Sequence, residues 1–274
     1  MVSTDRVREL VDSVPFWWHS IDVGGGVVSN GQRSAEQVRR QWEDLKLPEL
    51  RGKTVLDINT WDGFFAFEAE KHGASSVCAL DFYMWAMDLQ EHRRHWKECQ
   101  EKNVIPEPYH EMPYFKPAEL PGKRGFDVAH QLRGSNVKSL VADFMNTDLE
   151  RLGKFDVVLF LGSLYHMENP LESLKRLATV TRELAVIETQ AALVPGYEHH
   201  SLCEFFESNE LNGDVSNWWA PNEMALCGMC RAAGFPRVDV VSGTPSQAVG
   251  GGLRHLITGK NGVVRYRAVV HAWK

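Results

Sequence analysis

The alternation of apolar and polar positions predicts a βαβ unit in the first third of the chain. Residues 54–58 form a short apolar run with β-branched side chains, as expected of a strand that is buried on both faces. Turn residues occupy positions 59–63, and apolar and charged residues then mix over 64–71, as in a helix packed on a sheet. A second apolar run, 77–80, ends at Asp81. An acidic residue there is placed to accept hydrogen bonds from both ribose hydroxyls of a nucleoside.

The turn in this unit departs from a dinucleotide-binding fingerprint. In the frame D-x-G-x-G-x-G, which begins at Asp57, Asn59 and Trp61 replace the first two glycines and only Gly63 is kept. Those glycines let the backbone approach a pyrophosphate closely. The turn therefore favours a ligand without phosphate, such as S-adenosylmethionine (SAM). A doubly wound unit that binds some other ligand is the alternative.

The remaining pattern predicts further elements of an α/β fold. Ser34 and Gln37 form a capping box at the start of one helix, and the glycines at 24–26 predict a hairpin turn or hinge. The predicted helices cover residues 4–13, 34–47, 84–102, 125–132, 170–179 and 221–233. The later predicted strands cover 137–143, 155–161, 184–189, 238–241 and 263–272, the last two being antiparallel and joined by a glycine-rich loop near 250–252.

These elements predict a Rossmann-like doubly wound α/β sheet, mostly parallel with a late antiparallel strand. We expect residues 51–274 to form this domain. Residues 1–50 are expected to form an N-terminal arm and helix that act as a lid.

The candidate catalytic residues follow the clearest predicted strands. In open α/β sheets, ligands bind outside the carboxyl ends of the strands. Tyr165 and His166 follow the strand at 155–161, and Glu188 lies at the end of the next strand. His166 is the natural general base for a hydroxyl acceptor, with Tyr165 and Glu188 in supporting or alternative roles. A histidine in a loop is also often structural, so both interpretations stay open at this stage.

Aromatic residues in two places are candidates for substrate binding. Trp17 and His19 lie in the N-terminal arm, and Trp218 and Trp219 lie in an irregular region, 191–219. Aromatic rings beside polar groups suit the face of a sugar or nucleoside. An arm packed on the sheet edge explains the first pair equally well. The irregular region also holds histidines and acids, but without the spacing of a zinc site, so a metal ion is left undetermined.

The composition narrows the class of partner. The 274 residues carry a formal net charge of −6 and a pI near 6.0, so no basic excess indicates a nucleic-acid backbone as partner. No apolar run approaches the ~18 residues of a membrane helix, and the first ten residues lack the apolar core of a signal peptide. The five cysteines are scattered and odd in number, which favours a reducing cytoplasm.

Several segments follow one another in the order of a known enzyme family. They are VLDINTWDGFFAFEAEKHGA, ALD, FDVVLFLGSLYHMENPLESLKRL, AVIET and NWWAPNEMALCGMCRAAGF. With these segments the chain resembles class I SAM-dependent methyltransferases, and more narrowly the branch that contains the tRNA wobble-uridine carboxymethyltransferases. The resemblance implies SAM as cofactor and an acid, Asp143, at the adenine. By position, the resemblance implies cofactor contacts at Asn59, Asp81, Asp143, Phe144, Leu161 and Tyr165. The full set of expected cofactor-binding residues is Asp57, Asn59, Trp61, Gly63, Asp81, Phe82, Asp143, Phe144, Leu161 and Gly162.

The chain also departs from that branch. The tRNA enzymes carry a basic helical N-terminal domain, whereas only a few dozen residues precede the core here. They hold a carboxylated cofactor partly through a lysine, and Ser13 stands at the matching position of this chain. An unpaired cofactor carboxylate in a closed site would cost on the order of several kcal/mol. We therefore expect ordinary SAM and an acceptor other than tRNA.

The expected function is O-methylation of a hydroxyl on a small polar acceptor, such as a sugar or a secondary metabolite. Two alternatives stay open: a tRNA wobble-uridine methyltransferase, and a non-catalytic SAM-binding module. We expect a cytoplasmic protein whose partner is a small molecule rather than nucleic acid or a membrane. A homodimer is one expectation for its assembly.

Overall fold

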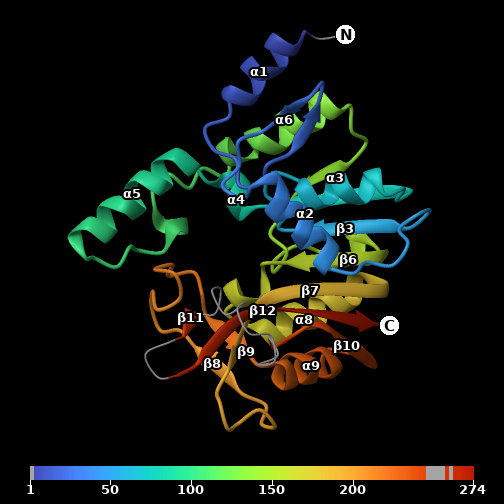
Figure 1. Cartoon of the computed structure of the whole chain (residues 1–274), viewed down its shortest axis with the longest axis vertical. Helices are drawn as coiled ribbons and strands as arrows, with labels where there is room; N and C mark the ends of the chain where they lie inside the picture. Colours follow the sequence, from blue (N-terminus) through green and yellow to red (C-terminus); the bar gives the residue numbers. More distant parts are fainter. Residues whose placement is uncertain (1–2, 245–256, 259–261) are drawn as a thin grey trace. The chain divides into compact units, whose positions relative to one another are not determined.

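The computed structural model describes residues 3–244, 257–258 and 262–274, and Figure 1 shows the path of the chain. By their internal contacts the residues fall into two compact units. Unit 1 comprises Met1–Glu43 and Leu47–Thr147, and unit 2 comprises Asp44–Lys46 and Asp148–Lys274. The expected arm, residues 1–50, lies almost entirely in unit 1, and its role as a lid stays a prediction. The glycine-rich loop predicted near residue 250 lies outside the described residues.

Unit 1 is built on parallel strands that confirm the predicted βαβ unit. Their order is β3-β4-β5, and helix α3 connects the first two (Figure 1). Apolar side chains of β3 and β4, such as Leu56 and Leu80, are fully buried. The strands and helices of unit 1 are α1 (Thr4–Asp12), β1 (Asp22–Gly24), β2 (Val27–Val28), α2 (Ala35–Asp44, whose last residue belongs to unit 2), β3 (Thr54–Ile58), α3 (Phe64–Lys71), β4 (Ser76–Asp81), α4 (Tyr83–Ala86), α5 (Leu89–Lys102), the 3-10 turns η1 (Tyr109–Glu111) and η2 (Pro121–Lys123), α6 (Arg124–Arg133) and β5 (Lys138–Val141).

Local hydrogen bonds set the ends of the helices in unit 1. The predicted capping box of α2 is present, since the Gln37 N–H donates to Ser34 Oγ at 3.3 Å and the Ser34 N–H donates to Gln37 Oε1 at 2.9 Å. The single helix predicted over 84–102 was wrong, because the segment forms α4 and α5 with an extended residue, Met87, between them. The Asp88 side chain caps α5 by accepting from the Glu91 N–H at 3.3 Å, so the second helix begins anew.

Unit 2 confirms the expected antiparallel strands at the end of the chain. Its strand order is β6-β7-β12-β10. β6 and β7 are parallel, whereas β12 is antiparallel to β7, and β10 is antiparallel to β12. The elements of unit 2 are α7 (Leu149–Leu152), β6 (Phe155–Leu161), η3 (Leu164–His166), α8 (Pro170–Val180), β7 (Thr181–Leu193), β8 (Cys203–Phe205), β9 (Trp219–Pro221), α9 (Glu223–Ala232), β10 (Arg237–Ser242), β11 (Ile257–Thr258) and β12 (Val264–Trp273).

Pairing with β12 explains why β7 is longer than the predicted 184–189. The two strands are in register from Leu184 to Leu193, so backbone hydrogen bonding carries β7 past the apolar run. Within 191–219, β8 and β9 form a separate two-stranded sheet that the sequence pattern did not indicate. Parallel strands with connecting helices, followed by antiparallel strands, make this the Rossmann-like α/β fold that the sequence predicts.

Candidate active site

The turn between β3 and α3 has a left-handed backbone at every position of the glycine frame. The φ angle is 60° at Asn59, 54° at Trp61 and 89° at Gly63. The turn therefore adopts the conformations that glycine usually supplies, although two glycines are absent. Asparagine tolerates this region, whereas a residue such as tryptophan loses roughly 1–2 kcal/mol there. Gly63 has no room for a side chain, because a Cβ would lie 2.7 Å from the rings of Phe126 and Phe67.

Three contacts hold Trp61 in this conformation. Its N–H donates to Asp81 Oδ2 at 2.8 Å, and its carbonyl accepts from Trp85 Nε1 at 2.6 Å. Its indole stacks on that of Trp18, with ring centroids 4.7 Å apart and planes inclined by 5°. Stacked aromatic pairs contribute about 0.5–1.5 kcal/mol beyond the area that they bury. Tertiary contacts thus offset the strain of Trp61.

Two buried carboxyl groups lie beside this turn. Asp81, at the end of β4, also accepts from the Met84 N–H at 3.1 Å, and Asp57, in β3, accepts from Thr60 Oγ1 at 2.5 Å. Burial raises the pKa of Asp81 to about 6, although backbone donors lower it. Burial raises the pKa of Asp57 to about 7 against the effect of the Thr60 hydrogen bond. Both groups therefore take up protons more readily than ordinary aspartates.

The second predicted cofactor acid follows β5. Asp143 accepts from the Met145 N–H at 2.9 Å, from Asn146 Nδ2 at 2.6 Å and from the Tyr83 hydroxyl at 3.3 Å. Phe144 is buried. Because β3, β4 and β5 are parallel neighbours, their carboxyl ends bring the predicted positions from Asp57 to Phe144 to one edge of unit 1.

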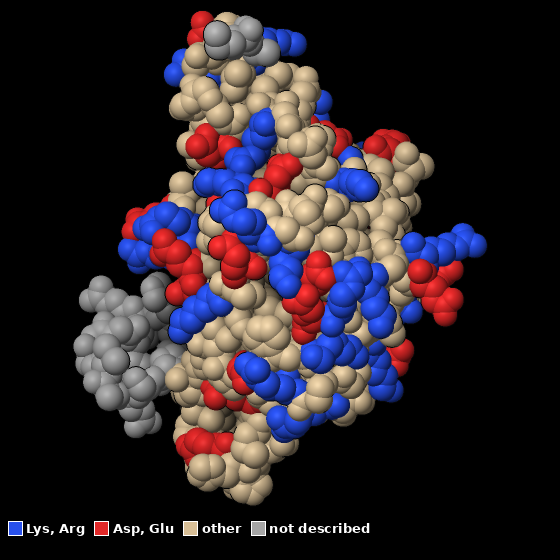
Figure 2. All heavy atoms as spheres, turned by 90° about the vertical axis from the view of Figure 1, so that its right-hand side faces the viewer, with Lys and Arg blue, Asp and Glu red and all other residues tan. Residues whose placement is uncertain are grey.

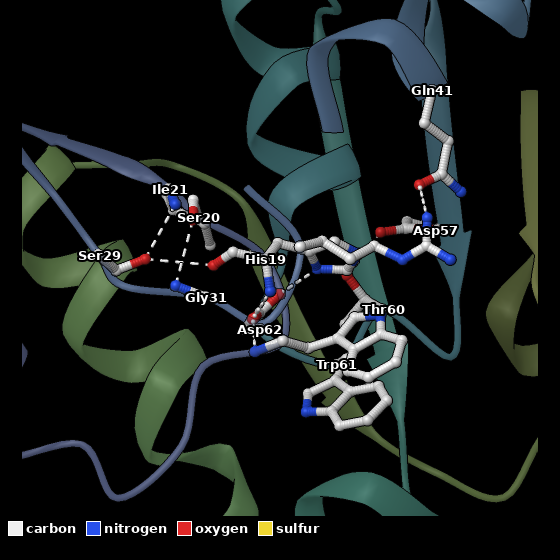
Figure 3. A network of polar contacts seen from close by, with 12 residues as sticks. His19, Ser20, Ile21, Ser29, Gly31, Gln41, Asp57, Thr60, Trp61 and Asp62 are labelled. Atoms are coloured by element: carbon white, nitrogen blue, oxygen red, sulfur yellow. Dashed lines mark hydrogen bonds and ion pairs between the residues drawn. The ribbon is translucent and has the colours of Figure 1, made fainter. Parts of the chain in front are cut away.

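The N-terminal arm is tied to the same turn through Asp62 (Figure 3). Asp62 Oδ1 lies 2.5 Å from His19 Nδ1, and Asp62 Oδ2 accepts the backbone N–H groups of Trp18 at 2.9 Å and His19 at 2.8 Å. Asp62 and His19 are both buried. Trp17 is also buried, and its Nε1 donates to the Val11 carbonyl at 3.2 Å. The predicted substrate residues Trp17 and His19 thus have partners inside unit 1, and their contact with a substrate stays a prediction.

A polar groove of about 520 Å³ lies beside this arm. Arg93 of α5 lines it, with its guanidinium 4.6 Å from the centre of the Phe16 ring. No carboxylate of the described residues forms an ion pair with Arg93. The other lining residues are Val11, Asp12, Val14, Pro15, Trp17, Asn30, Gly31 and Gln32. The amide side chains of Asn30 and Gln32, together with the aromatic residues Phe16 and Trp17, suit a polar organic molecule.

In unit 2 the predicted catalytic residues meet a cation that sequence reasoning missed. The Arg267 guanidinium of β12 forms a two-pronged ion pair with Glu188 of β7. It also lies 4.8 Å from the centre of the Tyr165 ring. Although desolvation opposes it, the Glu188 carboxylate raises the pKa of Arg267 further above its ordinary value. Arg267 is 79 residues from Glu188 in the sequence. The one sequence signal for it is a charged residue within a predicted strand that is otherwise largely apolar.

His166 lies in η3, directly after the β6 end at Leu161 and the left-handed Gly162. Its ring centroid is 4.1 Å from that of Tyr165. Its Nδ1 lies 2.9 Å from the Ser216 hydroxyl and 3.1 Å from the Ser216 carbonyl. Desolvation lowers the pKa of His166, although Asp214 acts in the opposite direction. The imidazole is therefore neutral at pH 7.

The predicted pair Trp218 and Trp219 lies on the same loop cluster as His166. The Trp218 N–H donates to the Tyr165 carbonyl at 2.8 Å, and Trp219 Nε1 donates to the Glu168 carbonyl at 3.2 Å. Both indoles also pack against the half-exposed Phe205, at centroid distances of 6.4 and 4.9 Å. In unit 2, Tyr165 thus contacts His166, the backbone of Trp218 and the Arg267 that pairs with Glu188. The catalytic and substrate-binding roles of these residues stay predictions.

Residues 33–240 match a family model described as a methyltransferase domain. The chain belongs to this methyltransferase family. It is 22% identical over 204 residues to a tRNA U34 carboxymethyltransferase of Helicobacter pylori (strain G27), a match that covers 74% of the chain and 64% of the relative's length. The corresponding enzyme of Colwellia psychrerythraea (strain 34H / ATCC BAA-681) is 22% identical over 205 residues, which are 74% of this chain and 51% of that protein. The chain thus matches less than two thirds of the length of these curated relatives.

Solved structures confirm the fold of the methyltransferase. The crystal structure of the N-terminal domain of EvdMO1 in the presence of SAH and D-fucose aligns with a TM-score of 0.60, covering 100% of this chain and 98% of that chain at 18% identity. Haemonchus contortus phosphoethanolamine N-methyltransferase 2 in complex with SAM aligns with a TM-score of 0.50 at 13% identity, covering 77% and 40% of the two chains. The match to the methyltransferase family, rather than the fold alone, makes this protein a SAM-dependent enzyme and not a non-catalytic binding module.

The residues at the edge of unit 1 fit the nucleoside part of SAM. Carboxylates stand at the ends of adjacent strands, at Asp81 and Asp143, and the left-handed turn exposes backbone groups beside them. The turn residues 59–63 include no Lys or Arg that could pair with a phosphate group. When bound, SAM supplies an electrophilic methyl group on a sulfonium. The individual roles of these residues, and of Leu161 and Gly162 in unit 2, stay predictions.

The described residues give no sign of a metal centre or a membrane span. They contain no group of three or more His, Cys, Asp or Glu side chains arranged to hold a metal ion. Among the same residues, no helix has both the length and the hydropathy needed to cross a membrane. On the face seen in Figure 2, Lys and Arg side chains lie among Asp and Glu side chains, and several of them gather in its lower half.

Proposed function

We propose that this methyltransferase transfers the methyl group of SAM to a hydroxyl of a small polar acceptor, such as a sugar or a secondary metabolite. The observation that carries the proposal is the setting of His166. Its Nδ1 is held by Ser216, its ring packs on Tyr165, and its lowered pKa leaves it neutral at pH 7. A hydroxyl acceptor must lose a proton as its oxygen is methylated, and a positioned imidazole contributes about 10²–10⁴-fold to such a step.

Two further observations support a sugar-like acceptor. Phe205, Trp218 and Trp219 form an aromatic cluster beside the Tyr165–His166 loop, and aromatic faces pack well against the apolar face of a sugar ring. The EvdMO1 domain, which shares the fold, was solved in the presence of D-fucose. We infer that the cofactor is ordinary SAM, since Ser13 stands at the position of the lysine that would pair with a cofactor carboxylate.

A tRNA acceptor is the second candidate, and the match to tRNA U34 carboxymethyltransferases favours it. The net charge of −6 opposes it, because RNA binding draws mainly on contacts between cations and phosphates. An electrophoretic shift assay with tRNA at several salt concentrations separates the two candidates. Binding that weakens steeply with salt supports tRNA, whereas the small-acceptor proposal predicts no such binding.

The direct test is a methyl-transfer screen with SAM across sugars, phenols, amines and tRNA. The product should be a methyl ether, identified by mass spectrometry and NMR. For an active sugar, the matched control is the deoxy sugar that lacks only the methylated hydroxyl, and it should give no turnover. Turnover with amines or tRNA alone would contradict the proposal. A homodimer and a cytoplasmic location complete the proposal, and sedimentation and cell fractionation test them.

A further inference from the structure

The loop between β8 and β9 holds a serine and an aspartate next to His166. The Ser216 hydroxyl donates to Asp214 Oδ1 at 2.7 Å, and the Ser216 N–H donates to the same oxygen at 2.8 Å. Buried Asn217 fixes the loop by donating from Nδ2 to the Leu211 carbonyl at 2.8 Å and to the Asp214 carbonyl at 3.1 Å. These hydrogen bonds hold the loop in place.

These contacts determine which ring nitrogen of His166 carries the proton. Both groups that face Nδ1 act as acceptors, because the Ser216 carbonyl has no proton and the only hydroxyl proton of Ser216 goes to the Asp214 carboxylate. Nδ1 must therefore carry hydrogen. In a neutral imidazole the other nitrogen then holds the lone pair. Within the described residues, Nε2 has no hydrogen-bond partner.

We propose that Asp214 and Ser216 are positioning residues, which hold His166 in the Nδ1–H tautomer and so present Nε2 as the base. The inference rests on the proposed function. In the step, the acceptor O–H proton moves to Nε2 while the acceptor oxygen forms a bond to the methyl carbon. The methyl–sulfur bond breaks, and its electron pair stays on sulfur. The ring becomes an imidazolium with hydrogen on both nitrogens, and it later returns one proton to solvent.

The charged groups around His166 act in opposite directions on this imidazolium. The Asp214 carboxylate stabilises it through the Ser216 hydroxyl, as the orienting acid of a catalytic triad does. The Arg267 guanidinium opposes it, but Arg267 is paired with Glu188. Among the described residues, Tyr165 is a further titratable group, and its ring packs on that of His166. Removal of the Asp214 charge should therefore make the imidazolium harder to form.

The first experiment reads the tautomer of the whole wild-type protein and needs no activity. Two-bond ¹H–¹⁵N correlation spectra with ¹⁵N-labelled histidine distinguish protonated from unprotonated ring nitrogens, and comparison with His166→Gln assigns the signals. The Nδ1–H tautomer is expected at pH 8. An Nε2–H tautomer would overturn the proposal, whatever the variants do.

The second experiment compares pH profiles of kcat for Asp214→Asn, Ser216→Ala and Ser216→Thr. Because the rate needs neutral His166, it falls below the imidazole pKa. Without the Asp214 charge the pKa of His166 falls, so the acid side of the kcat profile should move to lower pH. The maximal kcat should drop about 10- to 100-fold, because the imidazole is no longer held in the required tautomer. Ser216→Ala should also lower the plateau, and Ser216→Thr, which keeps the hydroxyl, should retain most of it.

Glu210→Gln is the matched control, because Glu210 lies on the same loop and accepts from the backbone N–H groups of Glu207 and Ser208 but does not contact His166. It should leave the plateau and the acid limb unchanged. If His166→Ala abolishes turnover while Asp214→Asn and Ser216→Ala behave like the control, the positioning role is refuted and the proposed function stands. If His166→Ala keeps full kcat, both are refuted.

Discussion

Trp61 allows a sharp test of the cofactor turn, because its left-handed backbone can be separated from its indole. Trp61→Gly and Trp61→Ala both remove the stack on Trp18 and its surface burial. Only alanine keeps a Cβ at a φ of 54°. The left-handed region costs a residue with a Cβ roughly 1–2 kcal/mol, and the greater unfolded-state entropy of glycine offsets about 0.4–1 kcal/mol of this. We therefore expect Trp61→Gly to be more stable than Trp61→Ala by about 1 kcal/mol.

Equilibrium urea unfolding followed by circular dichroism measures this difference. Lys71 provides the matched control, since it lies in α3 with its side chain 63% exposed. There the order should invert, with Lys71→Gly less stable than Lys71→Ala, because glycine has the lower helix propensity. If Trp61→Ala is as stable as Trp61→Gly or more stable, the left-handed conformation of Trp61 is refuted. SAM titration of the same proteins should favour Trp61→Gly, because it keeps the path of the turn.

Three further predictions concern buried acids. Asp81→Asn should weaken SAM binding in calorimetry by about 1.5–3 kcal/mol, since it removes a charged acceptor, and unchanged affinity would reject the ribose assignment. With a folded pKa of about 7 for Asp57, above its ordinary ~3.9, stability should fall as pH rises from about 4 through 7. Asp57→Asn should flatten that slope in urea unfolding, and an unaltered slope would contradict the burial argument. Glu188→Gln leaves Arg267 without its carboxylate partner and should lower the free energy of unfolding by roughly 1–3 kcal/mol. The loss is smaller than for a fully buried pair because the Arg267 side chain is 36% exposed. The same variant should also lower kcat. The control Glu204→Gln breaks the ion pair of Glu204 with Arg265 and should lower stability without lowering kcat. If the Glu188→Gln and Glu204→Gln variants have the same kcat, Glu188 has no catalytic role.

Local patterns predicted much of the fold. The apolar runs located β3, β4 and β6, and the Ser34–Gln37 box located the start of α2, because each depends on neighbouring residues in the sequence. The break between α4 and α5 was missed, since the charges around it continue a helical pattern and only the side chain of Asp88 caps the second helix.

The candidate site was predicted in part. Asp81, Tyr165 and His166 follow or end the strands that the sequence predicts, so their places in the fold could be foreseen, and their roles stay predictions. The left-handed Trp61 could not be foreseen, because it depends on stacking with Trp18, 43 positions earlier in the chain. Arg267 and Ser216 were missed for the same reason, since their partners lie 79 and 50 residues away.

The central claim is that neutral His166 takes the proton of a hydroxyl acceptor, and one comparison tests it most directly. kcat as a function of pH and the Kd for SAM are measured for the wild type and for His166→Ala with the acceptor found in the screen. We predict a wild-type rate that falls on the acid side, with an apparent pKa below the ordinary ~6.5. His166→Ala should lower kcat by about 10²-fold or more while the Kd for SAM changes by no more than a few-fold. An unchanged kcat in the variant would contradict the account.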